Sequence, residues 1–437
     1  MEYVSAVLQQ ETMEQCKQNA GKEQVVRMNG TVHAIRNMGE VCFVILRRRE
    51  GLLQCVCSKQ MARELKEEMA VTVQGTVTEE SRAPGGIEMH LTEVTVLSRP
   101  AEPLPLAISK RKINTSLETK LNLRAVSLRN IGERAKFKVQ EGLVRGFRDY
   151  LYSQGFTEIH TPKIGAKGAE GGANIFKLDY FHQKAVLEQS PQLYKQMMVG
   201  VFERVFETGP VFRAEKHNTK RHLNEYTSLD FEMGFIESFA DLMAMETGFL
   251  QYAMEMLQDS YGEELAYLGV TLPNTEEIPV VRFDEAKEMV AEKYKRPIRN
   301  PYDLEPEEEQ LIGRLFQEDY DADFVFVTHY PSKKRPFYAM DDPADRRFTL
   351  SFDLLFRGLE VTTGGQRIHE YDALVEKIAE RGMTTEGLEY YLDAFRYGMP
   401  PHGGLGIGAE RLTMQLLGEE NVRETTLFPR DLNRLEP

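Results

Sequence analysis

Charged side chains alternate with apolar ones in residues 211–233, and their spacing predicts a shared surface. Arg213 and Glu215 stand two positions apart in one strand-like piece, as Asp230 and Glu232 do in the next. Side chains two positions apart on a strand point to the same face. A sheet face that carries an arginine and carboxylates cannot pack as an ordinary core. We therefore expect a polar cleft here, although a solvated charged face is the alternative for the basic loop between the two pieces.

A second group of charged residues lies in "SFDLLFRGLEVTTGGQRIHEYD" (351–372). Asp353 and Glu360 flank an apolar strand, and Arg367 follows a double glycine. Carboxylates beside glycines that allow close approach suit a hard divalent cation that carries phosphate. A surface hairpin with scattered charge fits poorly with the surrounding Phe and Leu residues.

A third pattern, "GGLGIGAERLTMQLLG" (403–418), joins a glycine-lined strand to a helix whose first turn carries Arg411. A dinucleotide-binding fold is disfavoured because too little chain follows for the rest of a βαβ unit. Arg411 is instead expected to be a fixed cation for phosphate. No nucleophile with a base, zinc spacing or P-loop is visible, so the three groups favour phosphoryl or nucleotidyl transfer by positioning and charge neutralisation.

One more cation stands at the edge of an apolar run. Lys195 in "SPQLYKQ" is followed by "MMVGVF". An ammonium group leading into a hydrophobic segment requires an anionic partner.

These residues need two kinds of scaffold. Residues 23–98 alternate apolar and polar residues in five short strands, with a helical piece between the third and fourth, which predicts a five-stranded Greek-key barrel of the kind that binds single-stranded nucleic acid. From about residue 130 amphipathic helices flank strand-like runs, which predicts an antiparallel sheet packed against helices. The predicted fold class is α+β, with an OB-type barrel domain at 1–103, a linker at 104–130 and a catalytic domain at 131–437.

Composition limits the remaining possibilities. The chain has 437 residues, a net charge of −14 and four cysteines, and that charge argues mildly against non-specific nucleic-acid binding. No signal peptide or membrane-spanning run is visible. We expect reduced thiols and a cytoplasmic protein without a membrane partner.

The three patterns together resemble the three signature motifs of class II aminoacyl-tRNA synthetases. "GFTEIHTPKI" (155–164), with Pro162, resembles the dimer-forming first motif, "FRAE" and its loop the second, and "GLGIGAERL" the third. Within class II (IIb), the resemblance is greatest to aspartyl-tRNA synthetases of the compact archaeal type, and it covers nearly the whole chain. It implies a homodimer, L-aspartate, ATP and tRNA(Asp) as substrates, and Mg²⁺ as cofactor.

The resemblance also implies roles for individual residues. Lys195 and Arg367 would bind the side-chain carboxylate of aspartate, and asparaginyl enzymes lack this lysine. The other residues implied to bind aspartate are Glu170, Gln192, Arg213, Asp230 and Thr363. Residues implied to bind ATP are Arg213, Glu215, Arg221, His222, Leu223, Tyr226, Glu360, Gly408 and Arg411. Glu360, Thr363 and Asp353 would hold the metal, and the catalytic residues would be Arg213, Arg411 and Glu360.

The barrel is expected to bind the anticodon through Phe43, Gln54 and Glu88. Thr31 stands where many discriminating archaeal enzymes have tryptophan, and Pro84 lies in a loop where proline accompanies relaxed recognition of the third anticodon base. These two positions favour an enzyme that also charges tRNA(Asn). The alternatives are a strict tRNA(Asp) enzyme, an asparaginyl-tRNA synthetase, an enzyme that makes free asparagine, and a catalytically inactive tRNA-binding paralogue.

Overall fold

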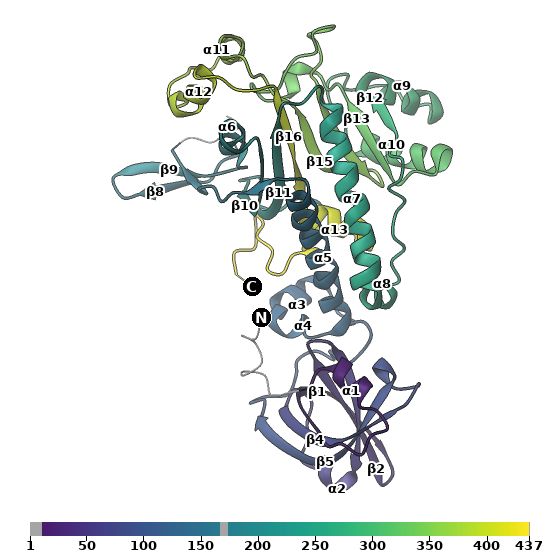
Figure 1. Ribbon diagram of the computed structural model, residues 1–437. Helices are drawn as coiled ribbons and strands as arrows, with labels where there is room; N and C mark the ends of the chain where they lie inside the picture. Colours follow the sequence, from purple (N-terminus) through teal and green to yellow (C-terminus); the bar gives the residue numbers. More distant parts are fainter. Residues whose placement is uncertain (1–10, 167–173, 437) are drawn as a thin grey trace. The chain divides into compact units, whose positions relative to one another are not determined.

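The structure is a computed structural model that describes residues 11–166 and 174–436 (Figure 1). The chain divides into two compact units, one of Met1–Ser116 with Ala125–Ile131 and the other of Leu117–Arg124 with Gly132–Pro437. The expected division at residues 103 and 130 stays a prediction.

The first unit contains the barrel. Five strands close in the order β1-β2-β3-β5-β4, as the alternating pattern predicts. Their bounds are β1 Val26–Met38, β2 Val41–Arg48, β3 Gly51–Ser58, β4 Ala70–Glu79 and β5 Ile87–Ser98. Short helices accompany them: α1 Met13–Gln18, α2 Lys59–Ala62 in the predicted position between β3 and β4, and the 3-10 helix η1 Pro84–Gly86. All four cysteines are buried and free, and they pack with the aliphatic side chains of the barrel core.

An eight-stranded sheet dominates the second unit, in the order β12-β13-β14-β15-β16-β11-β10-β6. The six central strands pair antiparallel, as predicted, but the edge strands β12 and β6 pair parallel with their neighbours. The bounds are β6 Thr157–Glu158, β10 Arg204–Phe212, β11 Glu225–Gly234, β12 Val280–Arg282, β13 Phe324–Thr328, β14 Ser351–Phe356, β15 Leu359–Gln366 and β16 His402–Gly408. A small second sheet joins β7 Ile164–Gly165, β9 Gln183–Leu187 and β8 Lys177–Tyr180.

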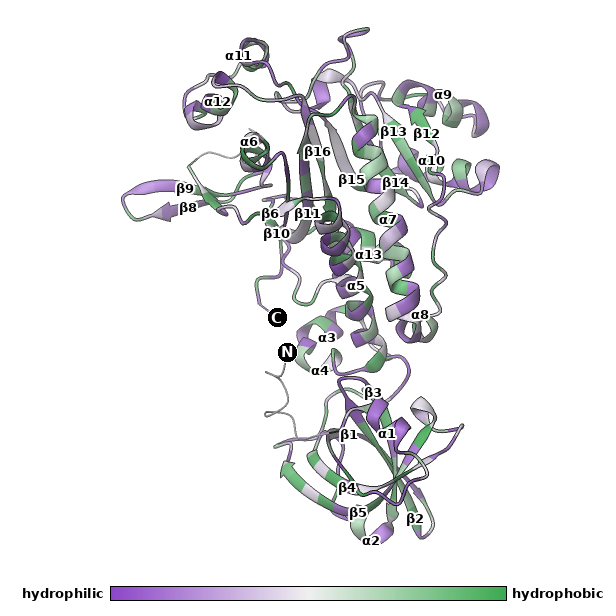
Figure 2. Ribbon diagram, viewed as in Figure 1, coloured by the Kyte–Doolittle hydropathy of each residue, from purple (hydrophilic) through white to green (hydrophobic). Residues whose placement is uncertain are grey.

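Two long helices pack beside each other and bury apolar side chains together with one face of the large sheet (Figures 1 and 2). They are α5 Ile131–Ser153, which Gly155 follows with φ +77°, and α7 Ala240–Ser260. Residues four apart on α5, such as Val139, Leu143 and Phe147, are buried, as the sequence pattern predicts.

The other helices surround this framework. They are α3 Leu117–Asn122, α4 Arg124–Ser127, α6 Gln192–Phe202, α8 Gly262–Leu268, α9 Phe283–Lys293, α10 Pro306–Tyr320, α11 Tyr371–Glu380, α12 Glu389–Arg396 and α13 Ala409–Leu417, with the 3-10 helices η2 Ser332–Lys334 and η3 Val422–Thr425. None of the helices in the described part of the chain is long and apolar enough to span a membrane.

Candidate active site

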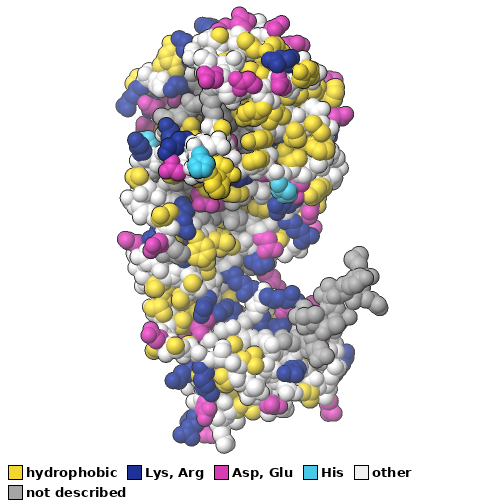
Figure 3. All heavy atoms as spheres, turned by 90° about the vertical axis from the view of Figure 1, so that its left-hand side faces the viewer, with side chains coloured by type: hydrophobic (Ala, Val, Ile, Leu, Met, Phe, Trp, Pro, Cys, Tyr) yellow, Lys and Arg dark blue, Asp and Glu magenta, His cyan; other side chains and the backbone are white. Residues whose placement is uncertain are grey.

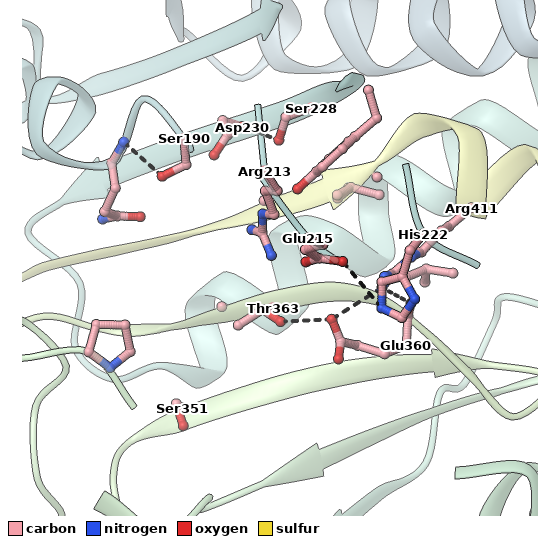
Figure 4. Close-up of a pocket in the computed structure, with 18 of the residues that line it drawn as sticks. Ser190, Arg213, Glu215, His222, Ser228, Asp230, Ser351, Glu360, Thr363 and Arg411 are labelled. Carbon is pink, nitrogen blue, oxygen red and sulfur yellow. Dashed lines mark hydrogen bonds and ion pairs between the residues drawn. The ribbon is translucent and has the colours of Figure 1, made fainter. Parts of the chain in front are cut away.

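The three sequence patterns meet in one cavity of about 310 Å³ in the second unit (Figure 4). β11 and the loop that joins it to β10 form one part of its wall, β15, β16 and α13 form another, and residues of α6, η2 and the chain after it, β14 and η3 complete it. The predicted site residues that line it are Gln192, Arg213, Glu215, Arg221, His222, Leu223, Tyr226, Asp230, Glu360, Thr363, Arg367, Gly408 and Arg411. Lys195 and Asp353 are not among the described residues that line it, and Glu170 lies outside the described residues.

Strand β16 can serve as part of the cavity floor because its glycines let neighbouring groups approach closely. A Cβ atom at Gly404 would lie 2.1 Å from the Phe231 carbonyl oxygen and 2.3 Å from Glu232 Oε2. The pattern that resembles a dinucleotide motif is therefore explained by packing against β11. The glycines of β16 leave room for two buried carboxylates beside the strand, those of Asp230 and Glu232.

One end of the site carries buried charges of both signs. Lys195 is 1% exposed, and its Nζ lies 2.9 Å from Asp230 Oδ1 and 3.4 Å from Glu232 Oε2. It also donates to the Leu405 carbonyl oxygen at 2.8 Å. The anionic partner that the sequence analysis requires for Lys195 is thus Asp230, together with Glu232.

Arg367 occupies the same end of the cavity. Its Nε donates to Glu232 Oε1 at 2.9 Å, and its Nη2 donates to the Gly404 carbonyl oxygen at 2.9 Å and to Gln192 Oε1 at 3.4 Å. Burial opposes ionisation of Glu232, but Arg367 and Lys195 overcome it and hold the pKa of that carboxyl below its ordinary value. The ionised pair of Glu232 and Arg367 is therefore favoured in a place shielded from water.

The other end of the cavity carries the residues expected to bind a nucleotide. The Arg213 guanidinium carbon lies 5.7 Å from the centre of the Tyr226 ring, within the range of a cation–π contact. His222 Nε2 lies 3.6 Å from Glu215 Oε2. Burial lowers the pKa of His222 below its ordinary value, although Glu215 acts in the opposite direction. The neutral form of the His222 ring is therefore favoured in this part of the cavity.

Arg411 connects two walls of the cavity from the first turn of α13. Its Nε donates to the Arg221 carbonyl oxygen and its Nη1 to the Glu360 carbonyl oxygen, each at 3.2 Å. The Glu360 carboxylate lies 3.6 Å from Arg411 Nη1 (Figure 4). A guanidinium fixed in this way presents a permanent positive charge to the cavity.

A divalent cation fits part of the predicted donor set. Glu360 and Thr363 both line the cavity, and the Thr363 hydroxyl donates to Glu360 Oε1 at 3.3 Å. Asp353 is buried and pairs with Arg335 at 2.8 Å, and burial raises its pKa to about 6. Within residues 11–166 and 174–436, no three His, Cys, Asp or Glu side chains are grouped to hold a metal ion. Glu360 and Thr363 alone suit Mg²⁺, which commonly takes one or two carboxylates and completes its shell with phosphates and water.

Several polar residues of this site carry no recognisable role in the sequence patterns. The Asn224 side chain donates to the Arg213 and Glu215 carbonyl oxygens at 2.7 and 3.1 Å, and so fixes the backbone that carries both. Glu309 pairs with Arg221 at 2.8 Å, and Arg335 pairs with Asp353. Asn224 lies inside the quoted motif, so its position was a usable signal. Glu309 and Arg335 come from other segments, and nothing local in the sequence marks them.

Comparison with known proteins identifies the family. Residues 116–432 match the family described as tRNA synthetases class II (D, K and N), and residues 26–97 match the OB-fold nucleic acid binding domain. The chain belongs to the class II tRNA synthetases. This finding confirms the predicted resemblance and the predicted α+β fold with an N-terminal OB-fold domain.

Relatives match this class II synthetase over nearly its whole length. The aspartate–tRNA(Asp/Asn) ligase of Deinococcus radiodurans is 50% identical over 420 residues, which is 95% of this chain and 96% of that protein. The aspartate–tRNA(Asp) ligase of Pyrococcus furiosus is 40% identical over 422 residues, 94% of this chain and 96% of that protein. The crystal structure of asparaginyl-tRNA synthetase from Pyrococcus horikoshii complexed with asparaginyl-adenylate has a TM-score of 0.88 at 32% identity, and covers 97% of this chain and 99% of that one.

The barrel of the synthetase places the predicted anticodon residues on the outside of neighbouring strands. Gln54 on β3 stands opposite Glu88 on β5, and Gln54 Nε2 donates to Glu88 Oε2 at 2.7 Å. Phe43 on β2 is half-buried and pairs with Val56, between the buried Cys42 and Val44. Because Phe43 alternates with buried residues, it lies on the outer surface of the barrel rather than in its core.

The two residues predicted to influence tRNA choice lie apart in the barrel topology. Thr31 is half-buried on β1, where it pairs with Arg47 on one side and Ala70 on the other. Pro84 is half-buried at the first position of η1, between β4 and β5. Their role in discrimination stays a prediction.

Proposed function

We propose that this class II synthetase attaches L-aspartate to tRNA in an ATP-dependent reaction that passes through aspartyl-adenylate. The observation that carries the proposal is a pair of buried cations: Arg367, which lines one end of the cavity, and Lys195, which lies behind Asp230. The guanidinium of Arg367 offers only N–H donors, so a substrate carboxylate can accept from it with both oxygens, whereas the NH₂ group of an amide would find no acceptor there. The aspartate–tRNA ligases that are 40–50% identical to the chain support the same assignment.

In this proposal the residues of the cavity bind both substrates of the first step. Gln192 and Asp230 orient the amino acid, with Glu170, and Arg367 binds its side chain with Lys195 behind Asp230. Arg213 and Tyr226 face the adenylate, and Glu215 hydrogen-bonds the adenine amino group. Leu223 and Gly408 line the nucleotide pocket.

The chemistry then requires positioning and charge neutralisation rather than a protein nucleophile. A carboxylate oxygen of aspartate attacks the α-phosphorus in line, and pyrophosphate leaves with the bonding electrons. Arg213 and Arg411 stabilise the negative charge that develops, and Arg221 and His222 hold the departing phosphates. A ribose hydroxyl of the terminal adenosine of tRNA next takes the aspartyl group, and AMP leaves.

Magnesium would be held by Glu360 and Thr363 together with the phosphates of ATP. When bound, it would neutralise phosphate charge. Asp353 is the weaker candidate of the three predicted ligands, because Arg335 already occupies one of its oxygens.

The proposal includes a second tRNA, tRNA(Asn). Thr31 and Pro84 support it, and the Deinococcus relative carries an Asp/Asn name. The Pyrococcus furiosus relative, named for tRNA(Asp) alone, represents the strict alternative. The asparaginyl alternative is supported by the likeness to the Pyrococcus horikoshii structure and opposed by Lys195.

A homodimer in the cytoplasm completes the proposal. Pro162 in the first motif is exposed, and so are large apolar side chains of the second unit: Tyr152, Ile164, Phe176, Tyr180, Val201 and Phe202. Figure 3 shows hydrophobic side chains gathered on one face of the molecule. Light scattering after size exclusion tests the dimer, and a mass near 50.1 kDa, that of one chain, would contradict it.

Aminoacylation tests the function directly. Labelled aspartate is offered with tRNA(Asp) and with tRNA(Asn) transcripts in parallel, and labelled asparagine serves as the control. Charging of both tRNAs with aspartate is expected. Charging of tRNA(Asp) alone would remove the tRNA(Asn) part, and transfer of asparagine or no transfer would contradict the proposed function.

A further inference from the structure

A carboxylate on helix α10 lies behind the nucleotide end of the cavity. Glu309 is 5% exposed and is not among the described residues that line the cavity. Arg221, which does line it, donates from Nη1 to Glu309 Oε2 at 2.8 Å and from Nη2 to Oε1 at 3.3 Å. A two-point contact between guanidinium and carboxylate fixes the plane of the arginine as well as its position.

The Glu309 carboxylate also contacts the opposite wall of the site. Burial and the Glu360 carboxylate raise the pKa of Glu309 to about 6, whereas Arg221 and the Glu360 backbone N–H favour its ionised form. Close packing allows this contact, because a Cβ atom at Gly313 of α10 would lie 2.2 Å from the Gly358 nitrogen in the β14–β15 turn. The helix therefore lies against the turn that leads directly into Glu360.

Arg411 completes the link between these two walls. It donates to the carbonyl oxygens of both Arg221 and Glu360. Three residues expected to bind ATP are thus connected, and Glu309 contacts two of them. Within residues 11–166 and 174–436, Glu309 is the acidic side chain that pairs with Arg221.

An apolar side chain could hold the loop by packing at a lower cost in free energy than a buried carboxylate. Burial of a charge costs free energy unless paired groups compensate it. Its advantage here is orientation, because a two-point contact uses two of the five guanidinium N–H groups and leaves the others for phosphate oxygens. Such outer contacts commonly keep a binding group in its productive geometry.

We propose that Glu309 is a positioning residue for the triphosphate of ATP, acting through Arg221 and the Glu360 backbone. This inference rests on the proposed function for the identity of the nucleotide. Glu309 does not touch ATP. It holds Arg221 and the part of β15 that carries Glu360 in the arrangement that binds the phosphates.

Glu309→Gln tests the inference because it keeps the size of the side chain, removes its charge and replaces one of the two oxygens that accept from Arg221 by an NH₂ group that cannot accept. We expect KM for ATP in aspartate-dependent ATP–pyrophosphate exchange to rise about tenfold. KM for aspartate and kcat should change by less than about twofold, because the contacts at the aspartate end and the reacting groups remain.

Glu308→Gln is a matched control on the adjacent position of α10. Glu308 is 2% exposed and pairs with Lys287 at 2.7 Å and with Arg296 at 2.8 Å, in contacts that do not include the cavity residues. Its loss should lower the midpoint of thermal unfolding and leave KM for ATP unchanged. An equal rise of KM for ATP in both variants would show general loosening of α10 and overturn the inference.

A double-mutant cycle with Arg221→Ala provides the second test. When Arg221 is absent, Glu309→Gln should raise KM for ATP by less than about twofold, because the positioned group has been removed. Fully additive effects would overturn the inference. A lower KM for ATP in Glu309→Gln would also overturn it, since Glu309 would then compete with the triphosphate for Arg221.

Direct binding separates this inference from the proposed function. The dissociation constant of ATP is measured by calorimetry for the wild type, Glu309→Gln and Glu308→Gln without any amino acid. A tenfold weaker binding only in Glu309→Gln supports the role of Glu309 even if aspartate proves to be the wrong substrate. Equal binding by all three proteins contradicts it, whatever the substrate is.

Discussion

The ammonium group of Lys195 lies 2.9 Å from the carboxylate of Asp230, and both side chains are almost completely buried. Asp230 lines the cavity, whereas Lys195 lies behind it and also approaches Glu232. We therefore expect Lys195 to act on the proposed amino acid site indirectly. It compensates the negative charge of Asp230 and Glu232, which would otherwise repel an acidic substrate.

Lys195→Met should abolish most aspartate activation. Removal of one partner leaves buried carboxylates uncompensated, and we expect kcat/KM for aspartate in pyrophosphate exchange to fall by about 100-fold or more. Lys287→Met is the control, because Lys287 is similarly buried and pairs with Glu308 away from the cavity. A Lys195→Met enzyme with normal KM for aspartate, or the same loss in both variants, would contradict the role given to Lys195.

Tyr226 should contribute to ATP binding through its ring rather than its hydroxyl. The ring lies against the Arg213 guanidinium, a contact whose free energy is about 0.5–2 kcal/mol. Tyr226→Ala should therefore raise KM for ATP by roughly twofold to thirtyfold. Tyr226→Phe keeps the ring and should behave as the wild type. Steady-state pyrophosphate exchange at varied ATP distinguishes the two variants. An equal KM for ATP in both would show that the ring does not contribute to ATP binding.

Local pattern was sufficient to predict most of the strands and the direction of their side chains. The alternation of Asp230 and Glu232 on β11 correctly predicted a polar face, because the two-residue repeat of a strand depends only on neighbouring positions. The glycines of β16 and the helix after them were visible for the same reason. The strand predicted at Arg213 and Glu215 is wrong, because β10 ends at Phe212 and both residues lie in the loop that follows, although both line the cavity. The parallel edge strands β6 and β12 carried no comparable signal, since two or three residues are too few for a pattern.

Partners from distant segments could not be predicted in this way. Glu309 meets Arg221 across 88 positions of sequence, and Arg367 meets Glu232 across 135. These pairs depend on how α10 and β15 dock, which is decided by packing over the whole unit. Asp353 is a further example. It was predicted to hold the metal, but in the structure it pairs with Arg335, a residue that no local pattern connects to it.

Glu360 should set the magnesium requirement of the reaction. Its carboxylate is the partly exposed acidic group beside Thr363 in the cavity, and one or two carboxylates usually suffice for Mg²⁺ when phosphates complete the shell. Glu360→Gln should raise the Mg²⁺ concentration for half-maximal pyrophosphate exchange about tenfold or more. Asp323→Asn is the control, since Asp323 pairs with Arg357. Unchanged Mg²⁺ dependence in Glu360→Gln would exclude this carboxylate as a ligand.

His402 should make the second unit sensitive to acid. The side chain is buried, with Nδ1 2.9 Å from the Pro400 carbonyl oxygen and Nε2 3.4 Å from Gln196 Oε1. Burial lowers its pKa to about 4, with Glu232 opposing and Arg367 and His369 reinforcing this effect. The unfolded chain therefore binds a proton between pH 6.5 and about 4 that the folded chain does not, so stability falls as pH falls through this window.

The comparison of wild type with His402→Gln measures this effect. Complete protonation in the unfolded state alone would cost about 3 kcal/mol at most. Urea unfolding at pH 7 and pH 4.5 should show a smaller loss of free energy of unfolding in His402→Gln than in the wild type. Other groups titrate in both proteins and cancel in the difference. An identical loss in the two proteins would show that His402 is not the source.

Glu88 should act on tRNA without acting on aspartate activation. It lies on the outer face of the barrel, where Gln54 donates a hydrogen bond to it, and both side chains are half-buried. Glu88→Ala removes an acceptor for a base edge and leaves the Gln54 amide without its partner, so KM for tRNA(Asp) should rise roughly tenfold. Pyrophosphate exchange without tRNA should stay at the wild-type rate, because the reacting groups belong to the other unit.

Glu93→Ala is the control, since Glu93 also pairs with a glutamine of a neighbouring strand, Gln74, but lies on an exposed part of β5. A lower exchange rate in Glu88→Ala, or equal effects of the two variants on tRNA, would contradict a specific role for this pair in anticodon binding.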